Sequence, residues 1–202
     1  IDRIITERDL PLSTALGVMG INGVTAHYGL LALGKPCPSE TVVVSTAAGA
    51  VGSCVGQIAK IFGCRIVGIA GGEAKRRMCL DDFGYDEAID YKAPDFADRL
   101  REACRDGVDI YYDNTAGAIS DAVTEHLRPG ARIVICGTAS VDNWEPPPQG
   151  PRIERKLLVS RARMEGFVIF DHVDYYPLAR QDLARWLRED RLRYCEDVLH
   201  GL

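Results

Sequence analysis

A run of small residues behind a β-branched apolar stretch is the feature of this sequence best suited to bind a ligand. The run Ala47-Ala-Gly-Ala-Val-Gly52 follows Thr41–Ser45 and precedes a helix-like segment. Such a turn lets the backbone approach a pyrophosphate, while the N-terminus of the helix offers free N–H groups and the positive end of its dipole. The pattern reads Ala-x-Gly-x-x-Gly, and small residues also occur in βα turns for packing alone. It therefore needs support from a second segment.

That support comes from the end of the next apolar run, Arg65–Ala70. In an NAD site, an acidic residue about 20 positions after the glycine turn bonds the ribose 2′-hydroxyl. Here the run ends in Gly71 and Gly72 instead. Because a 2′-phosphate requires cationic donors rather than a carboxylate, this ending favours NADP over NAD.

Three basic residues follow this glycine pair. Lys75 is our main candidate for a phosphate ligand, and Arg76 is a second one. Glu73 lies nearby and is an objection, because a carboxylate repels phosphate. The alternative is that Lys75–Arg77 is a solvated helix face, as most charge runs are.

Six strand-like segments alternate with helical ones along the chain. The strands are predicted at Thr41–Ala47, Arg65–Ala70, Glu87–Tyr91, Val108–Asn114, Ala131–Gly137 and Met164–Phe170. The helices between them are predicted at Gly52–Phe62, Ala74–Phe83, Phe96–Cys104, Ala118–Leu127 and Ile153–Arg161. This alternation predicts an α/β fold, namely a Rossmann-type, doubly wound parallel six-stranded sheet in a three-layer α/β/α arrangement. Ligands of such folds bind beyond the carboxyl ends of the strands.

The remaining segments are less regular. Residues 1–40 are expected to form a helical lead-in, with helices at Ala15–Gly20 and Val24–Leu33 separated by a turn at Ile21–Gly23. Four prolines make 143–151 a loop at a strand end. Tyr175–Arg191 is predicted as a final amphipathic helix.

Composition bounds the class of protein. The 202 residues are 47% hydrophobic and carry a net charge of −5, without the clustered basic excess of a nucleic-acid surface. No apolar run is long enough to span a membrane, and the charged first residues do not resemble a secretory signal. The seven cysteines include no Cys-x-x-Cys pair, which favours reduced thiols in a cytoplasmic protein. Because the chain does not begin with Met, we expect a piece of a longer protein.

Several blocks together carry a family resemblance. They are Gly20–Ala26, Ala47–Ser53, Val55–Lys60, Asp113–Asn114, Ile135–Gly137 and Arg163–Val168. On these residues the chain resembles the medium-chain dehydrogenase/reductase superfamily. Within it, the chain is most similar to the zinc-independent, NADPH-dependent alkenal double-bond reductases, which include leukotriene B4 12-hydroxydehydrogenase, also called prostaglandin reductase.

The resemblance implies an NADP-binding domain at 41–202, no metal, and a GroES-like substrate domain that is absent from this chain. It also implies contacts to the pyrophosphate at Ala50–Ser53, to the 2′-phosphate at Lys75 and Tyr91, and to the nicotinamide side at Cys136–Ser140 and Phe167–Ile169. The implied cofactor-binding residues are Thr25, Gly49, Ala50, Val51, Gly52, Ser53, Gly71, Gly72, Lys75, Tyr91, Asn114, Cys136, Gly137, Thr138, Ser140, Phe167, Val168 and Ile169. Phe167–Ile169 could equally be core strand, and Cys136 a buried small residue of which only the backbone matters.

Two positions depart from the family pattern and leave the proton donor open. Asp142 stands where many relatives have the Tyr of Ser-x-Tyr-Asn, and His27 stands where they have the Tyr of Thr-Ala-Tyr. These two residues are the candidates for catalysis. A helix-surface position without a role is the competing interpretation of His27. The neighbouring Tyr28 should point about 100° away from it on a helix.

The implied reaction is hydride transfer from NADPH to the C=C bond of an α,β-unsaturated aldehyde or ketone. A quinone reductase, a zinc-free alcohol dehydrogenase and an NADPH-binding module without turnover are the alternatives. A methyltransferase is disfavoured, because it would have an acidic residue in place of the glycine pair. The edge strand around Glu165–Phe170 is expected to pair with a second copy in a homodimer.

Overall fold

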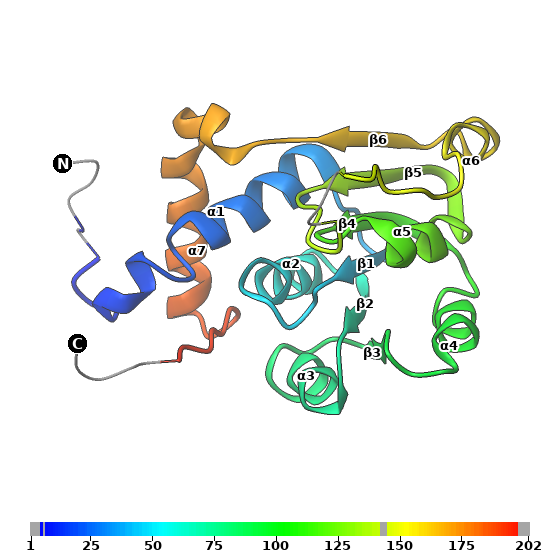
Figure 1. Ribbon diagram of the computed structural model, residues 1–202. Helices are drawn as coiled ribbons and strands as arrows, with labels where there is room; N and C mark the ends of the chain where they lie inside the picture. The colour runs from blue at the N-terminus through cyan, green and yellow to red at the C-terminus, as the bar shows by residue number, and fades with distance from the viewer. Residues whose placement is uncertain (1–4, 6, 142–144, 198–202) are drawn as a thin grey trace.

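The computed structural model of this protein describes residues 5, 7–141 and 145–197. One parallel sheet runs through it in the order β3-β2-β1-β4-β5-β6 (Figure 1). Its strands are β1 (Thr41–Ser45), β2 (Arg65–Ala70), β3 (Glu87–Asp90), β4 (Val108–Asp113), β5 (Leu127–Ile135) and β6 (Arg163–Gly166). The predicted doubly wound six-stranded sheet is therefore confirmed.

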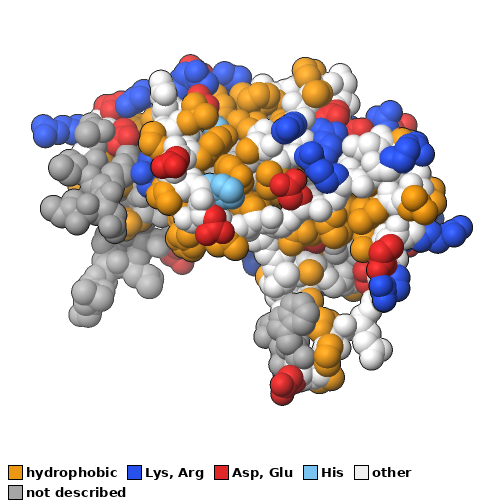
Figure 2. All heavy atoms as spheres, turned by 90° about the horizontal axis from the view of Figure 1, so that it is seen from above, with side chains coloured by type: hydrophobic (Ala, Val, Ile, Leu, Met, Phe, Trp, Pro, Cys, Tyr) orange, Lys and Arg blue, Asp and Glu red, His pale blue; other side chains and the backbone are white. Residues whose placement is uncertain are grey.

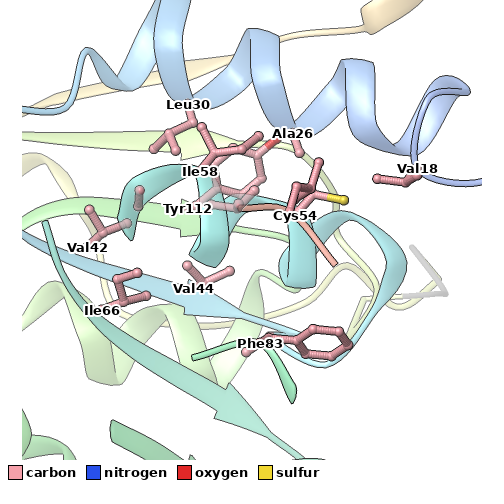
Figure 3. Packing of buried hydrophobic residues seen from close by; sticks show 14 of the residues in the cluster. Val18, Ala26, Leu30, Val42, Val44, Cys54, Ile58, Ile66, Phe83 and Tyr112 are labelled. Carbon is pink, nitrogen blue, oxygen red and sulfur yellow. The ribbon is translucent and has the colours of Figure 1, made fainter. Parts of the chain in front are cut away.

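Helices cover both faces of this sheet, and the apolar strand residues alternate between the two faces. Val42 and Val44 of β1 pack into a core with α1 (Ile21–His27), α2 (Ala50–Ile61) and α7 (Tyr176–Arg188), part of which Figure 3 shows. Val43 packs instead against α4 (Phe96–Ala103) and α5 (Gly117–Thr124). Because both faces are buried, the central strands are apolar at nearly every position.

The shorter helices connect or extend these elements. They are the 3-10 helices η1 (Leu12–Ala15) and η4 (Ile169–Tyr175), the π-helical turns η2 (Tyr28–Gly34) and η3 (Met78–Asp82), and the helices α3 (Glu73–Arg77) and α6 (Glu154–Ser160). In the structure η2 continues α1 and η3 continues α3. The predicted helices at 24–33 and 74–83 are thus each present as two joined pieces.

The lead-in differs from its prediction. Ala15–Gly20 is not a helix, and Ile21–Gly23 is not a turn but the first turn of α1. The helix starts there because Gly20 is extended, with φ −82° and ψ −154°, and occupies the N-cap position. Glycine at this cap is tolerated because it has no side chain to accommodate.

The sixth strand is shorter than predicted. It ends at Gly166, and Ile169 already begins η4, so neither Phe167 nor the residues after it belong to a core strand. The reason is its position: among the described strands β6 pairs only with β5, and β5 ends at Ile135. A last weak bond from the Phe167 N–H to the Ile135 carbonyl, at 3.4 Å, finishes the ladder.

The strand order produces a topological switch point beside β1. The chain leaves β1 towards β2 on one side, while the other neighbour of β1 is β4. Ligands of open parallel sheets bind at such a point, beyond the carboxyl ends of the strands.

Candidate functional site

A cavity of about 290 Å³ lies at this switch point. Its walls come from the turn after β1, the ends of β2 and β3, the turn after β4 and the segment after β5. The lining residues are Thr46, Ala48, Gly49, Ala70, Gly71, Lys75, Tyr91, Lys92, Thr115, Ile119, Ala139 and Ser140. The structure thus brings five of the predicted cofactor residues together, namely Gly49, Gly71, Lys75, Tyr91 and Ser140.

The turn between β1 and α2 forms one wall and needs its small residues. A Cβ atom on Gly52 would stand 2.3 Å from the Thr46 carbonyl oxygen, so no side chain fits there. The Ser53 N–H bonds the Gly49 carbonyl at 2.8 Å as the first bond of the helix. The N–H groups of Ala50, Val51 and Gly52 therefore precede the helical ladder and are available to an anion.

Ser53 itself is turned inwards. Its hydroxyl donates to the Ala50 carbonyl at 3.3 Å, and the side chain is buried. Its backbone N–H is used within α2, as described above. Of the predicted pyrophosphate segment Ala50–Ser53, the first three residues thus offer free N–H groups.

The end of β2 forms the opposite corner. A Cβ on Gly71 would lie 2.9 Å from the ring of Tyr91, so a side chain at this position would displace the ring. Gly72 adopts φ +89°, in the region that favours glycine. The tip of β2 is therefore a close backbone turn packed on an aromatic ring, with Lys75 one helical turn further on.

The basic run after β2 is divided between two roles. Arg76 donates twice to Glu73, from Nε and Nη2 at 2.7 Å each, and Arg77 donates from Nε at 3.0 Å. The Arg76 bonds, followed by those of Arg77, lower the pKa of Glu73 to about 2. Arg76 and Arg77 are thus paired with Glu73, whereas the exposed Lys75 lines the cavity.

A buried carboxyl group that the sequence did not reveal holds the turn after β4, which forms another wall of the cavity. Asp113, at the end of β4, is 0% exposed and accepts hydrogen bonds from two backbone N–H groups and four hydroxyl groups. The donors are the N–H groups of Thr115 and Ala116 and the hydroxyls of Ser45, Tyr111, Thr115 and Ser120. An acidic residue at the end of a mostly apolar strand was the available signal.

Asn114 is fixed to β1 by two bonds. Its N–H donates to the Ser45 hydroxyl at 2.8 Å, and its Nδ2 donates to the Ser45 carbonyl at 2.7 Å. Its own carbonyl accepts the Ala139 N–H. Asn114 therefore links the turn after β4 to the segment after β5.

Three of the remaining predicted residues, Thr25, Cys136 and Phe167, lie at a second corner around Tyr112. The Tyr112 hydroxyl donates to the Thr25 carbonyl at 3.0 Å, and a Cβ on Gly29 would meet both Tyr112 and Phe167. Burial raises the pKa of the neighbouring Cys136 thiol, so this thiol stays protonated at neutral pH. Gly137 and Thr138 follow Cys136 in the same segment, while Val168 is exposed and Ile169 is buried.

Tyr28 belongs to this second corner as well. Its ring stacks on His172 at 4.1 Å between centroids and lies 5.4 Å from the ring of Phe167. Tyr175 meets it edge-on at 5.0 Å. The sequence predicts that Tyr28 points about 100° away from His27 on the helix, and the rings packed against Tyr28 come from residues 167–175, after β6.

The helix-surface interpretation of His27 is wrong. Its side chain is 1% exposed, with Nδ1 3.0 Å from the Tyr175 hydroxyl and Nε2 3.1 Å from Asp182 Oδ2. It is buried because α7 crosses α1 here, and Trp186 stacks on the imidazole. Burial lowers the pKa of His27, and this outweighs the opposing effect of Asp182. The other catalytic candidate, Asp142, lies outside the described residues.

The sheet order and the small-residue turn at its switch point define a Rossmann-type α/β domain. The family model described as zinc-binding dehydrogenase matches residues 50–184, and the chain belongs to this family.

Among the described residues, no group of three His, Cys, Asp or Glu side chains could hold a metal ion. The same part of the chain contains no helix long and apolar enough to cross a membrane.

Individual relatives agree with the expected branch. The NADPH-dependent curcumin reductase of Escherichia coli (strain K12) is 42% identical over 195 residues, which are 94% of this chain and 56% of that protein. The 2-alkenal reductase (NADP(+)-dependent) of Nicotiana tabacum is 40% identical over 199 residues, 98% of this chain and 58% of that protein. The resemblance to the alkenal reductase branch is thereby confirmed.

A solved structure of a similar protein agrees with these sequence matches. The crystal structure of CurA in complex with NADPH from Vibrio vulnificus superposes with a TM-score of 0.88 at 46% identity. The match covers 93% of this chain and 57% of that one. The chain thus spans somewhat more than half the length of the relatives it matches.

We expect Asp113→Ala to destabilise the protein by about 3 kcal/mol or more, because it leaves several buried donors without an acceptor. Urea unfolding followed by circular dichroism measures this. Asp106→Ala is the matched control, since Asp106 is exposed in the loop before β4 and its free energy of unfolding should hardly change. Equal midpoints for the two variants would contradict the role given to Asp113.

The pH dependence of stability tests the burial of His27. Its folded pKa lies below its ordinary value of 6.5, so the unfolded chain binds more protons between these two values. Stability should therefore fall as the pH drops from about 7 towards 5. His27→Gln should flatten this fall, measured as urea midpoints across that range.

His126 is the internal control for this experiment. Burial lowers its pKa too, so His126→Gln removes a separate contribution. In that variant, the share of the pH-dependent fall in stability that comes from His27 should remain. An unchanged slope in His27→Gln would show that the imidazole is not held neutral.

Proposed function

We propose that the protein is an NADPH-dependent oxidoreductase that reduces the C=C bond of α,β-unsaturated aldehydes or ketones. In this proposal the chain supplies the cofactor-binding domain, and the substrate-binding part belongs to a segment outside it. The observation that carries it is Lys75, which lines the cavity where β2 ends in glycine rather than in a carboxylate. The relatives named for NADPH, curcumin and 2-alkenals support the same reaction class.

The residues present fit NADPH. The turn at Gly52 has no room for a Cβ, and the N–H groups of Ala50, Val51 and Gly52 suit the pyrophosphate. Lys75 and Tyr91 suit the 2′-phosphate at the other corner. The bound cofactor would supply the hydride, and the protein would orient it.

The second corner would then hold the nicotinamide side. The backbone of Cys136–Thr138 and of Phe167–Ile169 lies there, next to the aromatic groups of Tyr28 and Tyr112. Such a wall excludes water, which strengthens the electrostatic interactions available to a developing enolate. The protonated Cys136 thiol acts in packing and not as a nucleophile in this scheme.

Preference for NADPH over NADH is the direct test. Fluorescence or calorimetric titration should give clearly tighter binding of NADPH, because NADH lacks the 2′-phosphate. Lys75→Ala should weaken NADPH binding about tenfold, the loss expected for one charge-assisted contact, and leave NADH unchanged. Lys35→Ala, an exposed change at the opposite end of β1, is the control. Equal affinity for both cofactors in the wild type would contradict the proposal.

We further propose a homodimer formed through the edge of β6. Every residue of β6 is exposed, and within the described part of the chain only the side facing β5 is paired. Figure 2 views the molecule from this side and shows hydrophobic side chains gathered on it. The exposed hydrophobic residues in or just after β6 include Met164, Val168 and Phe170. A second copy would cover an edge that otherwise invites aggregation.

Light scattering at micromolar concentration should therefore give twice the mass of one chain, which for these 202 residues is 22.2 kDa. Glu165→Pro should reduce this mass, because proline removes a donor and disturbs an edge strand. A monomeric wild type across the concentration range would count against the dimer.

A further inference from the structure

The phosphate corner of the cavity is built from two separate chain segments. Gly71 and Lys75 follow β2, whereas Tyr91 and Lys92 follow β3. The strands are in parallel register, with Ala70 beside Asp90, so their ends meet at one edge. The close approach of Gly71 to the Tyr91 ring seals the junction.

One carboxylate oxygen ties these segments together. Oδ1 of Asp90 accepts the N–H of Gly72 and the N–H of Lys92, both at 2.9 Å. Asp90 thereby fixes the turn before α3 and the backbone that carries Lys92. The Gly72 bond, followed by the Lys92 bond, lowers the pKa of Asp90, so the carboxylate is ionised and accepts both bonds at neutral pH.

The ammonium groups at this corner are available to a ligand. No carboxylate of the described residues forms an ion pair with Lys75 or Lys92, although Glu73 and Asp90 are both close. Glu73 is occupied by Arg76 and Arg77, and the bonded oxygen of Asp90 by two backbone groups. The Lys92 ammonium lies 5.9 Å from the centroid of the Tyr91 ring, which forms part of the same wall.

We infer that Lys92 is a second cationic ligand of the cofactor's 2′-phosphate, opposite Lys75, and that Asp90 is the positioning residue that holds both segments around it. This inference rests on the proposed NADPH function. A phosphate dianion offers three oxygens, so two lysines from different strands can bind it together. Specificity for NADPH then depends on the β3 end as well as on the β2 end.

The Lys92 part is tested by titrating Lys92→Ala, Lys75→Ala and the double variant with NADPH, NADH and adenosine 2′,5′-bisphosphate. Lys92→Ala should weaken the two 2′-phosphorylated probes about tenfold and leave NADH unchanged. The difference should shrink in high salt, because an exposed charge contact is screened. Lys35→Ala again serves as the control.

The outcomes separate this inference from the proposed function. If the wild type prefers NADPH and Lys75→Ala loses that preference while Lys92→Ala does not, the inference is overturned and the function stands. If the wild type binds NADPH and NADH equally, the proposed function fails first. Loss of NADH binding in Lys92→Ala would indicate a general structural effect and would also overturn the role in phosphate recognition.

Asp90 gives a test of opposite sign. If Asp90 acted only as a nearby negative charge, Asp90→Ala and Asp90→Asn would both tighten NADPH binding. As a positioning residue, Asp90→Ala should weaken NADPH binding about tenfold, by loosening both segments, with much less effect on NADH. Asp90→Asn keeps an acceptor oxygen for the two N–H groups and should restore binding. Weakening by both variants alike, or by neither, would overturn the positioning role.

Discussion

The buried carboxylate of Asp113 holds the two strand ends between which the candidate site opens. β1 and β4 are neighbours in the sheet but are separated in the chain by two further strands. The Ser45 hydroxyl bridges them, since it donates to Asp113 and accepts the Asn114 N–H. The other donors to Asp113 shape the turn after β4, and Ser140 in turn bonds the Thr115 and Ala116 carbonyls of that turn. A buried carboxyl group is tolerated only when its oxygens have hydrogen-bond partners, so the network fixes the arrangement of this wall.

The sheet could be predicted from the sequence because its chemistry is repetitive. Strands buried on both faces must be apolar at nearly every position, and β1 and β2 are visible as such runs. Elements set by single residues or by tertiary pairing were less predictable. Gly20 looked like the end of a helix but caps the start of the next one. The apolar run after Gly166 looked like strand, yet its only neighbour has already ended at Ile135.

The candidate site divides in the same way. The glycine turn and Lys75 were predictable because their geometry depends on residues next to them in sequence. His27 was misplaced because its partners, Tyr175 and Asp182, lie 148 and 155 positions away. Asp113 and Asp90 were missed because an acidic residue at a strand end looks like a solvated one until its backbone donors are seen. Sequence reasoning thus finds residues that line the cavity more readily than residues that hold this lining in place.

The two corners of the candidate site differ in what lines them: backbone groups, glycines and cations at one, and packed side chains at the other. This difference bears on how one cofactor-binding domain could serve in proteins that act on different substrates. The phosphate corner consists of backbone N–H groups, glycines and a few cations, whose positions follow from the strand ends themselves. The second corner consists of side chains from α1, η2 and the segment after β6, packed ring against ring. A change of side chain there alters the wall without moving a strand end. In the proposed NADPH complex, cofactor recognition would therefore be tied to the sheet, whereas the wall proposed for the nicotinamide side could vary with Tyr28, Phe167 and His172.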